Sequence, residues 1–360
     1  MNEAAATFFD VFVGSYTSPL PHAPHADGPG ISRLRLDAST GGLSAPVLGA
    51  NSVQPSFVAL HPDGQTLYAV SERQHGELEA YRVQPDGILS PLGSQPTQGA
   101  FPAHVSVEPL GRYVLCVNYG SGVSVLAFPL GESGQMGPCA ATAQHQGHGP
   151  DTLRQAGPHP HSVTASPDGR YVYVADLGTD EIVCYDLAPE RLLHRLGQVR
   201  LPPGSGPRHL AFDAAGEWAF VSLELNAGVA LLRRDPDTGE MQLLGTWPTS
   251  PPSSSGDIAP AAVLVSPDGD FVYVSNRGPD SVAVFHVNRS AQTLTLVQHV
   301  PAQGQTPRGA ALSPDGAFLL VANQDSSSVT VFRRHPGDGT LESCGVFACP
   351  TPTCLCVLSR

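Results

Sequence analysis

Histidine, arginine and glutamate recur in this chain at two fixed distances from a repeated proline, and these residue types bind anions and transfer protons. His161, Arg208 and Arg308 each follow such a proline directly, whereas Glu224 and Arg277 stand seventeen residues after one. Arginine holds phosphates and carboxylates through a planar fork of N–H donors, and imidazole and carboxylate groups act as acids and bases. Because arginines gathered near one another need an anion or carboxylates as compensation, the set predicts a site for a small anionic ligand.

The repeat that carries these residues is a proline followed nine residues later by a glycine, with apolar, strand-like runs on both sides of the glycine. The six pairs are Pro55 and Gly64, Pro102 and Gly111, Pro160 and Gly169, Pro207 and Gly216, Pro260 and Gly269, and Pro307 and Gly316. Ser-Pro-Asp-Gly at 166–169 is typical of a tight turn, since proline fixes φ, aspartate caps the backbone and glycine adopts positive φ. Each unit therefore predicts a β-hairpin.

A third strand, and often a fourth, follows each hairpin, as at 281–285 and 328–332. The prolines are spaced by 47, 58, 47, 53 and 47 residues, which matches propeller blades rather than helical repeats. A seventh unit is divided between the chain ends, with an inner strand at 352–358 and further strands at 8–16 and 31–36. The sequence predicts an all-β fold: a seven-bladed β-propeller with four-stranded blades, one domain over residues 1–360, in which one blade is closed by both termini.

A propeller brings both recurring positions to one mouth of its central channel, because the first strand of each blade lines the channel and the second runs antiparallel to it. The position after the proline holds Ser56, Ala103, His161, Arg208, Ala261 and Arg308. The later position holds Glu72, Tyr119, Leu177, Glu224, Arg277 and Gln324, with Tyr16 in the equivalent place of the divided blade. Two units add a histidine at the next inner-strand position, His104 and His209.

We expect the charged members of these sets to converge on one funnel and to bind an anion. The alternative is a structural network in which Glu72 and Glu224 neutralise the arginines across blades, and His209 only braces Arg208.

Composition excludes several other functions. The net charge of −13 argues against binding to nucleic acid or to an anionic membrane. All nineteen basic residues are arginine, which excludes Schiff-base and P-loop lysine chemistry, and no G-x-S-x-G motif occurs. Seven cysteines without a C-x-x-C pair favour neither a disulfide framework nor a zinc site, so no metal and no cofactor is expected. Without a signal-like or long apolar segment, we expect a cytoplasmic monomer or small homo-oligomer.

The longest interval between repeat prolines contains an insertion at 141–158 that delivers His145, His148 and Arg154 just before the His161 strand. The insertion predicts a loop that lines the mouth. His-x-x-His spacing is compatible with a metal site, but we favour solvated loop histidines because no carboxylate-rich frame surrounds them. The Pro/Ser-rich stretch at 249–258 predicts a plain loop.

Several segments together resemble the seven-bladed propeller lactonases, a family that includes bacterial 6-phosphogluconolactonases and the fungal carboxy-muconate lactonizing enzyme. The resemblance covers the whole chain, and its carriers are Val13-Gly14-Ser15-Tyr16-Thr17, Pro55-Ser-Phe-Val58, Arg154-Gln155, Pro158-His159-Pro160-His161-Ser162, Gly206-Pro207-Arg208-His209, Glu224-Leu225-Asn226 and Asn276-Arg277-Gly278. It implies catalytic roles for His161, Arg208, Glu224 and Arg277. The predicted substrate-binding residues are Arg308, His104, His159, His209, Glu72, Gln324 and Tyr16.

The resemblance also implies an activity: hydrolysis of 6-phosphogluconolactone to 6-phosphogluconate in the pentose phosphate pathway. On this hypothesis Arg208, Arg277 and Arg308 bind the anionic substrate and polarise its carbonyl, while Glu224 or His161 activates water. One alternative is a cycloisomerase or lactonase for another carboxylated or unphosphorylated lactone of the muconate type. Another is a noncatalytic propeller scaffold for protein partners, which the missing Trp-Asp blade signatures disfavour.

Overall fold

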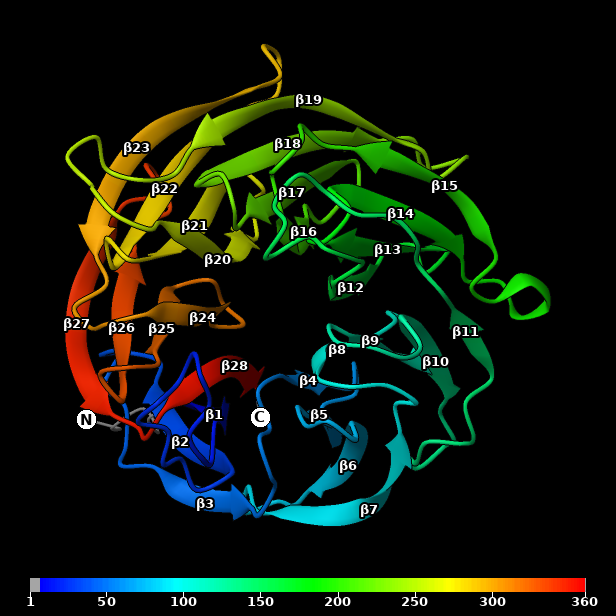
Figure 1. Ribbon diagram of the computed structural model, residues 1–360. Coiled ribbons are helices and arrows are strands. Elements are labelled where there is room, and N and C mark those ends of the chain that lie inside the picture. Colours follow the sequence, from blue (N-terminus) through cyan, green and yellow to red (C-terminus); the bar gives the residue numbers. More distant parts are fainter. Residues whose placement is uncertain (1–6, 360) are drawn as a thin grey trace.

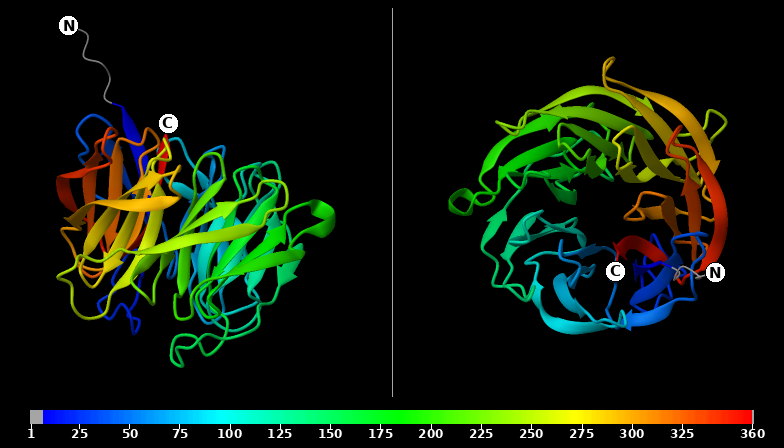
Figure 2. Two further views of the ribbon diagram at one scale, coloured as in Figure 1. Left: turned by 90° about the horizontal axis from the view of Figure 1, so that it is seen from above. Right: turned by 180° about the vertical axis from the view of Figure 1, so that it is seen from behind.

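Seven four-stranded antiparallel sheets form a closed ring in the computed structural model, which describes residues 7–359 (Figure 1). The strands β4, β8, β12, β16, β20, β24 and β28 lie innermost in their blades, and the views in Figures 1 and 2 place them around the centre of the ring. This confirms the predicted all-β, seven-bladed propeller.

The strand bounds follow blade by blade from the inner to the outer strand. Blades 1 to 3 contain β4 (Val58–Leu60), β5 (Thr66–Ser71), β6 (Glu77–Val83) and β7 (Leu89–Pro96); β8 (Pro102–Val107), β9 (Tyr113–Asn118), β10 (Val125–Pro129) and β11 (Ala141–Ala143); and β12 (Pro160–Ala165), β13 (Tyr171–Asp176), β14 (Glu181–Asp186) and β15 (Arg195–Arg200). Blades 4 and 5 contain β16 (Pro207–Phe212), β17 (Trp218–Leu223), β18 (Gly228–Arg234) and β19 (Met241–Pro248); and β20 (Ala259–Val265), β21 (Phe271–Arg277), β22 (Ser281–Asn288) and β23 (Thr293–Pro301). Blade 6 contains β24 (Pro307–Leu312), β25 (Phe318–Asn323), β26 (Ser328–Arg334) and β27 (Leu341–Ala348), and blade 7 contains β28 (Pro352–Ser359), β1 (Phe8–Ser15), β2 (Ile31–Asp37) and β3 (Val47–Ala50). A short 3-10 turn at Pro189–Arg191 precedes β15.

The repeated glycine closes the hairpin between the first two strands of a blade. At Gly169, φ is +66°, and its backbone N–H donates to the Ser166 carbonyl at 2.8 Å, while the Ser166 hydroxyl donates to Asp168. The other repeat glycines, Gly64, Gly111, Gly216, Gly269 and Gly316, have φ between +67° and +74°. This holds even for Gly111 and Gly216, whose units lack the Pro-Asp-Gly motif. The local sequence therefore fixes the turn that pairs the inner strand of each blade with the second strand.

Blade 7 joins the two ends of the chain. Strand β28 pairs antiparallel with β1 from Phe9 opposite Ser359 to Ser15 opposite Pro352, and β1 also pairs with β2. Red β28 therefore lies beside blue β1 in Figure 1, as predicted from the divided seventh unit. The sequence had not indicated the outer strand β3, which is four residues long and half exposed. Such a strand lacks the alternation of apolar residues that reveals longer ones.

The hydrophobic core lies between neighbouring blades. Tyr173 and Ile182 of blade 3 pack with Val221 and Leu232 of blade 4, and equivalent clusters fill the other junctions. Each sheet is thus buried on both faces, which leaves the ends of the strands to present polar side chains.

Polar links also recur at the blade junctions. Buried Arg234 of blade 4 forms an ion pair with Asp168 in the hairpin of blade 3 and donates to the Tyr173 hydroxyl at 3.0 Å. The Tyr173 hydroxyl in turn donates to the Gly239 carbonyl at 2.7 Å. A matching ion pair links Arg334 of blade 6 to Asp268 in the hairpin of blade 5, at 3.2 Å.

Candidate active site

A cavity of about 560 Å³ opens at the mouth where the inner strands begin. The residues that line it are Leu20, Pro21, His22, Glu72, Phe101, Ala103, Tyr119, Arg154, His161, Glu224, Arg277 and Arg308. His161 and Arg308 lie at the starts of β12 and β24, whereas Arg277 ends β21 and Glu224 directly follows β17. Both recurring sequence positions therefore meet at one mouth, as the propeller geometry requires.

A β-bulge at the start of the inner strands aims the residue after each repeat proline. In β12, Pro160 lies opposite Asp176 and Ser162 opposite Ala175, so His161 has no cross-strand partner. Arg308 occupies the same place in β24, between Pro307 and Gly309, and β16 has a longer irregularity that contains Arg208. Because a bulged residue is released from the regular alternation of the strand, its side chain can point into the mouth.

Glu224 is the centre of a buried ion cluster. Its Oε1 lies 2.5 Å from Arg154 Nη2, and its Oε2 lies 2.9 Å from Arg208 Nε and 2.7 Å from Arg277 Nη2. Burial by itself would raise the pKa of this carboxyl group, but the charges of Arg277 and Arg208 outweigh it and hold the pKa well below its usual range. Glu224 is therefore ionised at neutral pH.

The cluster leaves hydrogen-bonding capacity unused. Arg208 Nε, Arg277 Nη2 and Glu224 Oε2 are buried without an aligned hydrogen bond, although they lie close enough for ion pairing, and His161 Nδ1 is buried without a partner. Burial, followed by the charge of Arg277, lowers the pKa of Arg208 to about 9. Arg208 and Arg277 are therefore held next to Glu224 by charge, without the alignment of regular hydrogen bonds.

Arg308 is held in a second arrangement across the mouth. It donates to the Tyr16 hydroxyl at 2.8 Å, and this hydroxyl donates to Glu72 Oε2 at 3.0 Å. The guanidinium also lies over the Tyr16 ring, 5.3 Å from its centroid. Burial alone would lower the pKa of Arg308, but the electrostatic influence of Tyr16 and Glu72 outweighs it and raises that pKa. Arg308 is thus a fixed cation.

Three histidine rings lie behind the cavity wall or in it. His209 lies between His104 and His161, with ring centroids 5.5 and 5.6 Å away, and its Nε2 lies 2.9 Å from Arg208 Nη1. Burial is the main cause that lowers the pKa of all three, that of His104 to about 3, and the charge of Arg208 adds to it. Only His161 lines the cavity, so His209 braces Arg208 and His104 supports His209.

Three other predicted substrate-binding residues also lie outside the cavity lining: Tyr16, which holds Arg308, and the two residues described next. His159 stacks on Tyr119 with centroids 4.6 Å apart, and its Nδ1 lies 2.8 Å from the Tyr119 carbonyl oxygen. Buried Gln324 donates to the His22 carbonyl at 3.0 Å. Both residues hold a lining residue in place instead of facing the cavity.

The loops contribute residues that the repeat did not reveal as part of the site. His22 arrives on the loop between β1 and β2, and burial together with the Arg308 charge lowers its pKa to about 4. Arg154 arrives on the predicted mouth loop, where its contact with Glu224 was not foreseen. The only signals in the sequence were the length of these loops and the Arg154-Gln155 pair, because loops do not follow the blade repeat.

One expectation for the insertion is wrong. His145 is not solvated: it is 3% exposed, and its Nδ1 lies 2.6 Å from Asp176 Oδ2. The loop folds back onto blade 3, where Asp176 at the end of β13 accepts this contact. His148, in contrast, is exposed as expected. Among residues 7–359, no group of three metal-ligating side chains is positioned to hold a metal ion.

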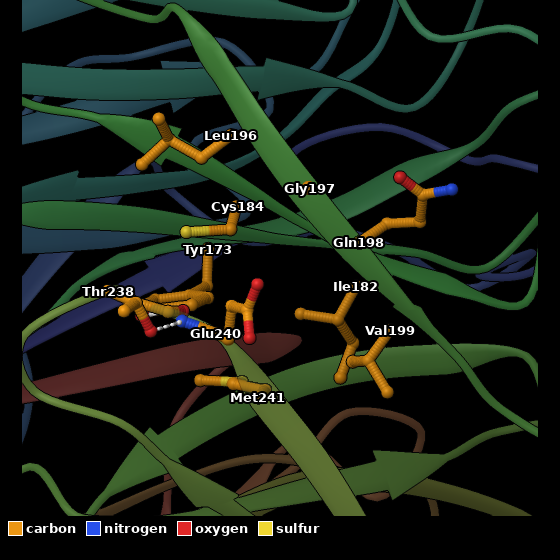
Figure 3. A pocket seen from close by; sticks show the side chains of 11 residues that line it. Tyr173, Ile182, Cys184, Leu196, Gly197, Gln198, Val199, Thr238, Glu240 and Met241 are labelled. Atoms are coloured by element: carbon orange, nitrogen blue, oxygen red, sulfur yellow. Dashed lines mark hydrogen bonds between the residues drawn. The ribbon is translucent and has the colours of Figure 1, made fainter.

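A second hollow of about 370 Å³ lies between the outer parts of blades 3 and 4 (Figure 3). Ile182, Val199 and Met241 form much of its wall, and Glu240 is the one charged side chain that lines it within the described chain. It offers no convergence of acids, bases or cations, so the mouth cavity is the stronger candidate for chemistry. No helix in residues 7–359 has the length and apolar character needed to cross a membrane.

Comparison with known proteins agrees with the propeller fold. A family model described as a seven-bladed β-propeller lactonase matches residues 10–357. The chain belongs to this lactonase family. It is 35% identical over 299 residues to the 6-phosphogluconolactonase of Bacillus subtilis (strain 168), covering 82% of this chain and 83% of that protein.

Other relatives of the chain are also named as lactonases. The 6-phosphogluconolactonase of Formosa agariphila is 32% identical over 314 residues, covering 84% of this chain and 85% of that protein. The solved structure of the periplasmic gluconolactonase PpgL from Pseudomonas aeruginosa superposes with a TM-score of 0.89 at 32% identity, covering 98% of this chain and 99% of that chain. These relatives support a lactonase role for the chain.

Proposed function

We propose that this lactonase hydrolyses 6-phosphogluconolactone to 6-phosphogluconate, which is the second step of the pentose phosphate pathway. The observation that carries the proposal is the charge at the mouth. The charged groups on the cavity or next to it are Arg154, Arg208, Arg277, Arg308, Glu72 and Glu224. Four guanidinium groups outnumber these two carboxylates, and they still outnumber the carboxylates when Asp325, whose charge acts on Arg308, is included. The mouth is therefore net positive, which suits a phosphate monoester with about 1.5 to 2 negative charges at neutral pH.

The buried arginines supply electrostatic stabilisation for ring opening. Arg208 Nε and Arg277 Nη2 pair with Glu224 Oε2, and the positive charge of these two guanidinium groups beside the cavity stabilises the oxyanion that forms when water adds to the lactone carbonyl carbon. Arg308 is fixed by Tyr16 and attracts the anionic substituent of the substrate. Because these donors are in place before the substrate arrives, little reorganisation opposes the reaction.

Glu224 and His161 carry the protons in this mechanism. Glu224 takes a proton from the attacking water, and the bond between the carbonyl carbon and the ring oxygen breaks. The proton held by Glu224 then passes through His161 to the ring oxygen, which leaves as a hydroxyl group, and Glu224 is ionised again. In the free protein the pKa values of both groups lie well below their ordinary values, through the arginine charges for Glu224 and through burial and Arg208 for His161. An anion bound among the arginines cancels part of that field and raises both pKa values, so the substrate itself makes these groups better bases.

The proposal is tested by following the loss of freshly prepared 6-phosphogluconolactone and of unphosphorylated gluconolactone with purified protein, with and without a chelator. We expect kcat/KM for the phosphorylated lactone to exceed that for gluconolactone by at least about 100-fold, since one charge-assisted contact contributes about 1.5 to 3 kcal/mol and several arginines contribute. Acceleration of gluconolactone alone, or loss of activity in chelator, would contradict the proposal.

A lactone with a carboxylate in place of the phosphate is a second candidate substrate. Leu20, Pro21 and Phe101 line the cavity beside the arginines. These apolar walls suit an unsaturated carbon skeleton better than a sugar with several hydroxyl groups. A carboxylated muconolactone measured in the same assay distinguishes the two candidates by the ratio of their kcat/KM values.

A further inference from the structure

Arg154 differs from the other two guanidinium groups that hold Glu224. Arg208 and Arg277 lie on β16 and β21, and their side chains are 3% and 17% exposed. Arg154 lies on the loop between β11 and β12, and its side chain is 44% exposed. Of the three, Arg154 is the most open to solvent, although Arg277 also lines the cavity.

The backbone under Arg154 is fixed although its side chain is open. The neighbouring Gln155 is fully buried, and its Nε2 donates to the Leu177 carbonyl and to Asp180 Oδ1, both at 2.8 Å. Asp151 Oδ1 accepts the Arg154 backbone N–H at 3.0 Å. A change of side-chain rotamer, with no movement of the loop, is therefore enough to take the guanidinium away from Glu224.

The three contacts divide unequally between the carboxylate oxygens. Arg208 and Arg277 both approach Oε2, whereas Oε1 contacts Arg154. The Arg154 guanidinium also lies 3.5 Å from the Tyr119 hydroxyl, and Tyr119 is part of the cavity lining. Arg154 thus stands between the open mouth and the one carboxylate oxygen that the strand arginines leave free.

We propose that Arg154 is a specificity-determining residue that exchanges partners: it pairs with Glu224 in the empty site and moves to the anionic substituent of the lactone when the substrate binds. This inference rests on the proposed function for the identity of the substrate, but it requires only that the ligand carry a phosphate or carboxylate outside the lactone ring. A lactone without such a group leaves Arg154 on Glu224.

The exchange couples recognition to chemistry. When Arg154 leaves, Glu224 Oε1 is free to accept the proton of the water that attacks the carbonyl carbon, while Oε2 stays with Arg208 and Arg277. A neutral lactone is therefore disfavoured in two ways. It binds more weakly because it lacks the charged contact with Arg154, and it reacts more slowly because Arg154 still occupies Glu224 Oε1. Specificity is then expressed in kcat as well as in KM.

Binding of the reaction product and its neutral counterpart tests the contact directly. We expect Arg154→Gln to weaken the affinity for 6-phosphogluconate about 10- to 100-fold by isothermal titration calorimetry, as expected for loss of one charge-assisted contact. The affinity for gluconolactam, an uncharged ring analogue without a phosphate, should change less than about threefold. Arg200→Gln is the matched control, because Arg200 is 77% exposed near the same loop and pairs with Glu181; it should leave both affinities unchanged.

The pH profile of kcat/KM distinguishes a role at the site from a purely structural role of Arg154, because a structural defect would not shift the profile along the pH axis. Removing the Arg154 charge raises the pKa of Glu224 in the free enzyme, so the acid limb should shift to higher pH in Arg154→Gln and return toward the wild-type position in Arg154→Lys. The groups whose charges act on Glu224 or are acted on by it are Arg154, Arg208, Arg277, Arg308, His161, His22 and Tyr119.

The outcomes separate this inference from the proposed function. Hydrolysis of 6-phosphogluconolactone by the wild-type protein, with equal losses for charged and uncharged ligands in Arg154→Gln, overturns the role of Arg154 and leaves the function standing. Selective loss of 6-phosphogluconate binding without any hydrolysis by the wild type upholds Arg154 and rejects the function. Unchanged binding of 6-phosphogluconate, or no binding to the wild type, also overturns the inference.

Discussion

Glu224 shows at the scale of one residue how a binding site differs from a structural ion network. A closed network would align each donor with an acceptor, whereas Arg208 Nε and Arg277 Nη2 approach Glu224 Oε2 without aligned hydrogen bonds. Positive charge also exceeds negative charge at this mouth. Both features favour the anion-binding interpretation over mutual neutralisation, because a stable buried network normally satisfies its polar groups.

The buried histidines should make stability sensitive to acid. The folded pKa of His104 is lowered by burial to about 3, below the ordinary value of 6.5, so as the pH falls below about 6.5 the unfolded chain takes up a proton that the folded protein does not. Each such group lowers the free energy of unfolding by about 1.4 kcal/mol per pH unit in that window, and it has no effect above it.

His104→Asn should therefore reduce the slope of unfolding free energy against pH between about 6 and 4 by about 1.4 kcal/mol per pH unit, measured by urea denaturation. Asparagine retains an acceptor for the Val163 backbone N–H, which lies 3.4 Å from His104 Nδ1. Exposed His148→Asn is the control and should keep the wild-type slope. Equal slopes for His104→Asn and the wild type would show that His104 is not held neutral by burial.

At the scale of the element, the repeat explains why sequence reasoning located some residues and missed others. His161 and Arg308 occupy bulges set by a proline that recurs in every unit, so aligning the chain with itself was enough to place them. His22 and Arg154 lie on loops whose conformations depend on contacts with distant residues, such as Gln324 for the first and Asp180 for the second. The same reason accounts for His145, whose burial depends on Asp176.

The ion pair between neighbouring blades makes a separate prediction. Arg234→Met should lower the free energy of unfolding by about 3 kcal/mol, because it removes a buried cation that contacts Asp168, Tyr173 and the Gly216 carbonyl. Chemical denaturation measures the change, and KM should stay within about twofold because the junction lies outside the mouth cavity.

Arg233→Met is the matched control for this junction, since Arg233 is the adjacent, exposed arginine on β18. It should change the free energy of unfolding by less than about 0.5 kcal/mol. Similar effects of the two substitutions would mean that the blade junction does not depend on the buried ion pair.

At the scale of the whole molecule, closure of the ring depends on β28. Its residues pair with β1 and pack against β24 of blade 6 and β4 of blade 1, so the last strand completes three blade contacts. The divided unit could be predicted because the apolar run at 352–358 lacked partners of its own. The weak outer strand β3 could not, because its residues are few and half exposed.

Truncation after Thr351 should abolish cooperative thermal unfolding, because it removes the inner strand of blade 7 and exposes the edge of β1. Differential scanning calorimetry and size-exclusion chromatography measure the effect, with aggregation as the expected product. Adding the 352–360 segment as a separate peptide should restore part of the transition. A truncated protein that unfolds as sharply as the intact one would contradict closure through β28.

The proposed mechanism requires that water opens an anionic lactone beside Glu224 and His161. The most direct measurement is kcat for 6-phosphogluconolactone in the wild type, Glu224→Gln and His161→Ala, with circular dichroism to verify folding. We predict that each substitution lowers kcat by about 10²- to 10⁴-fold, the usual contribution of a positioned acid or base. Near-normal rates in both folded variants would contradict the account.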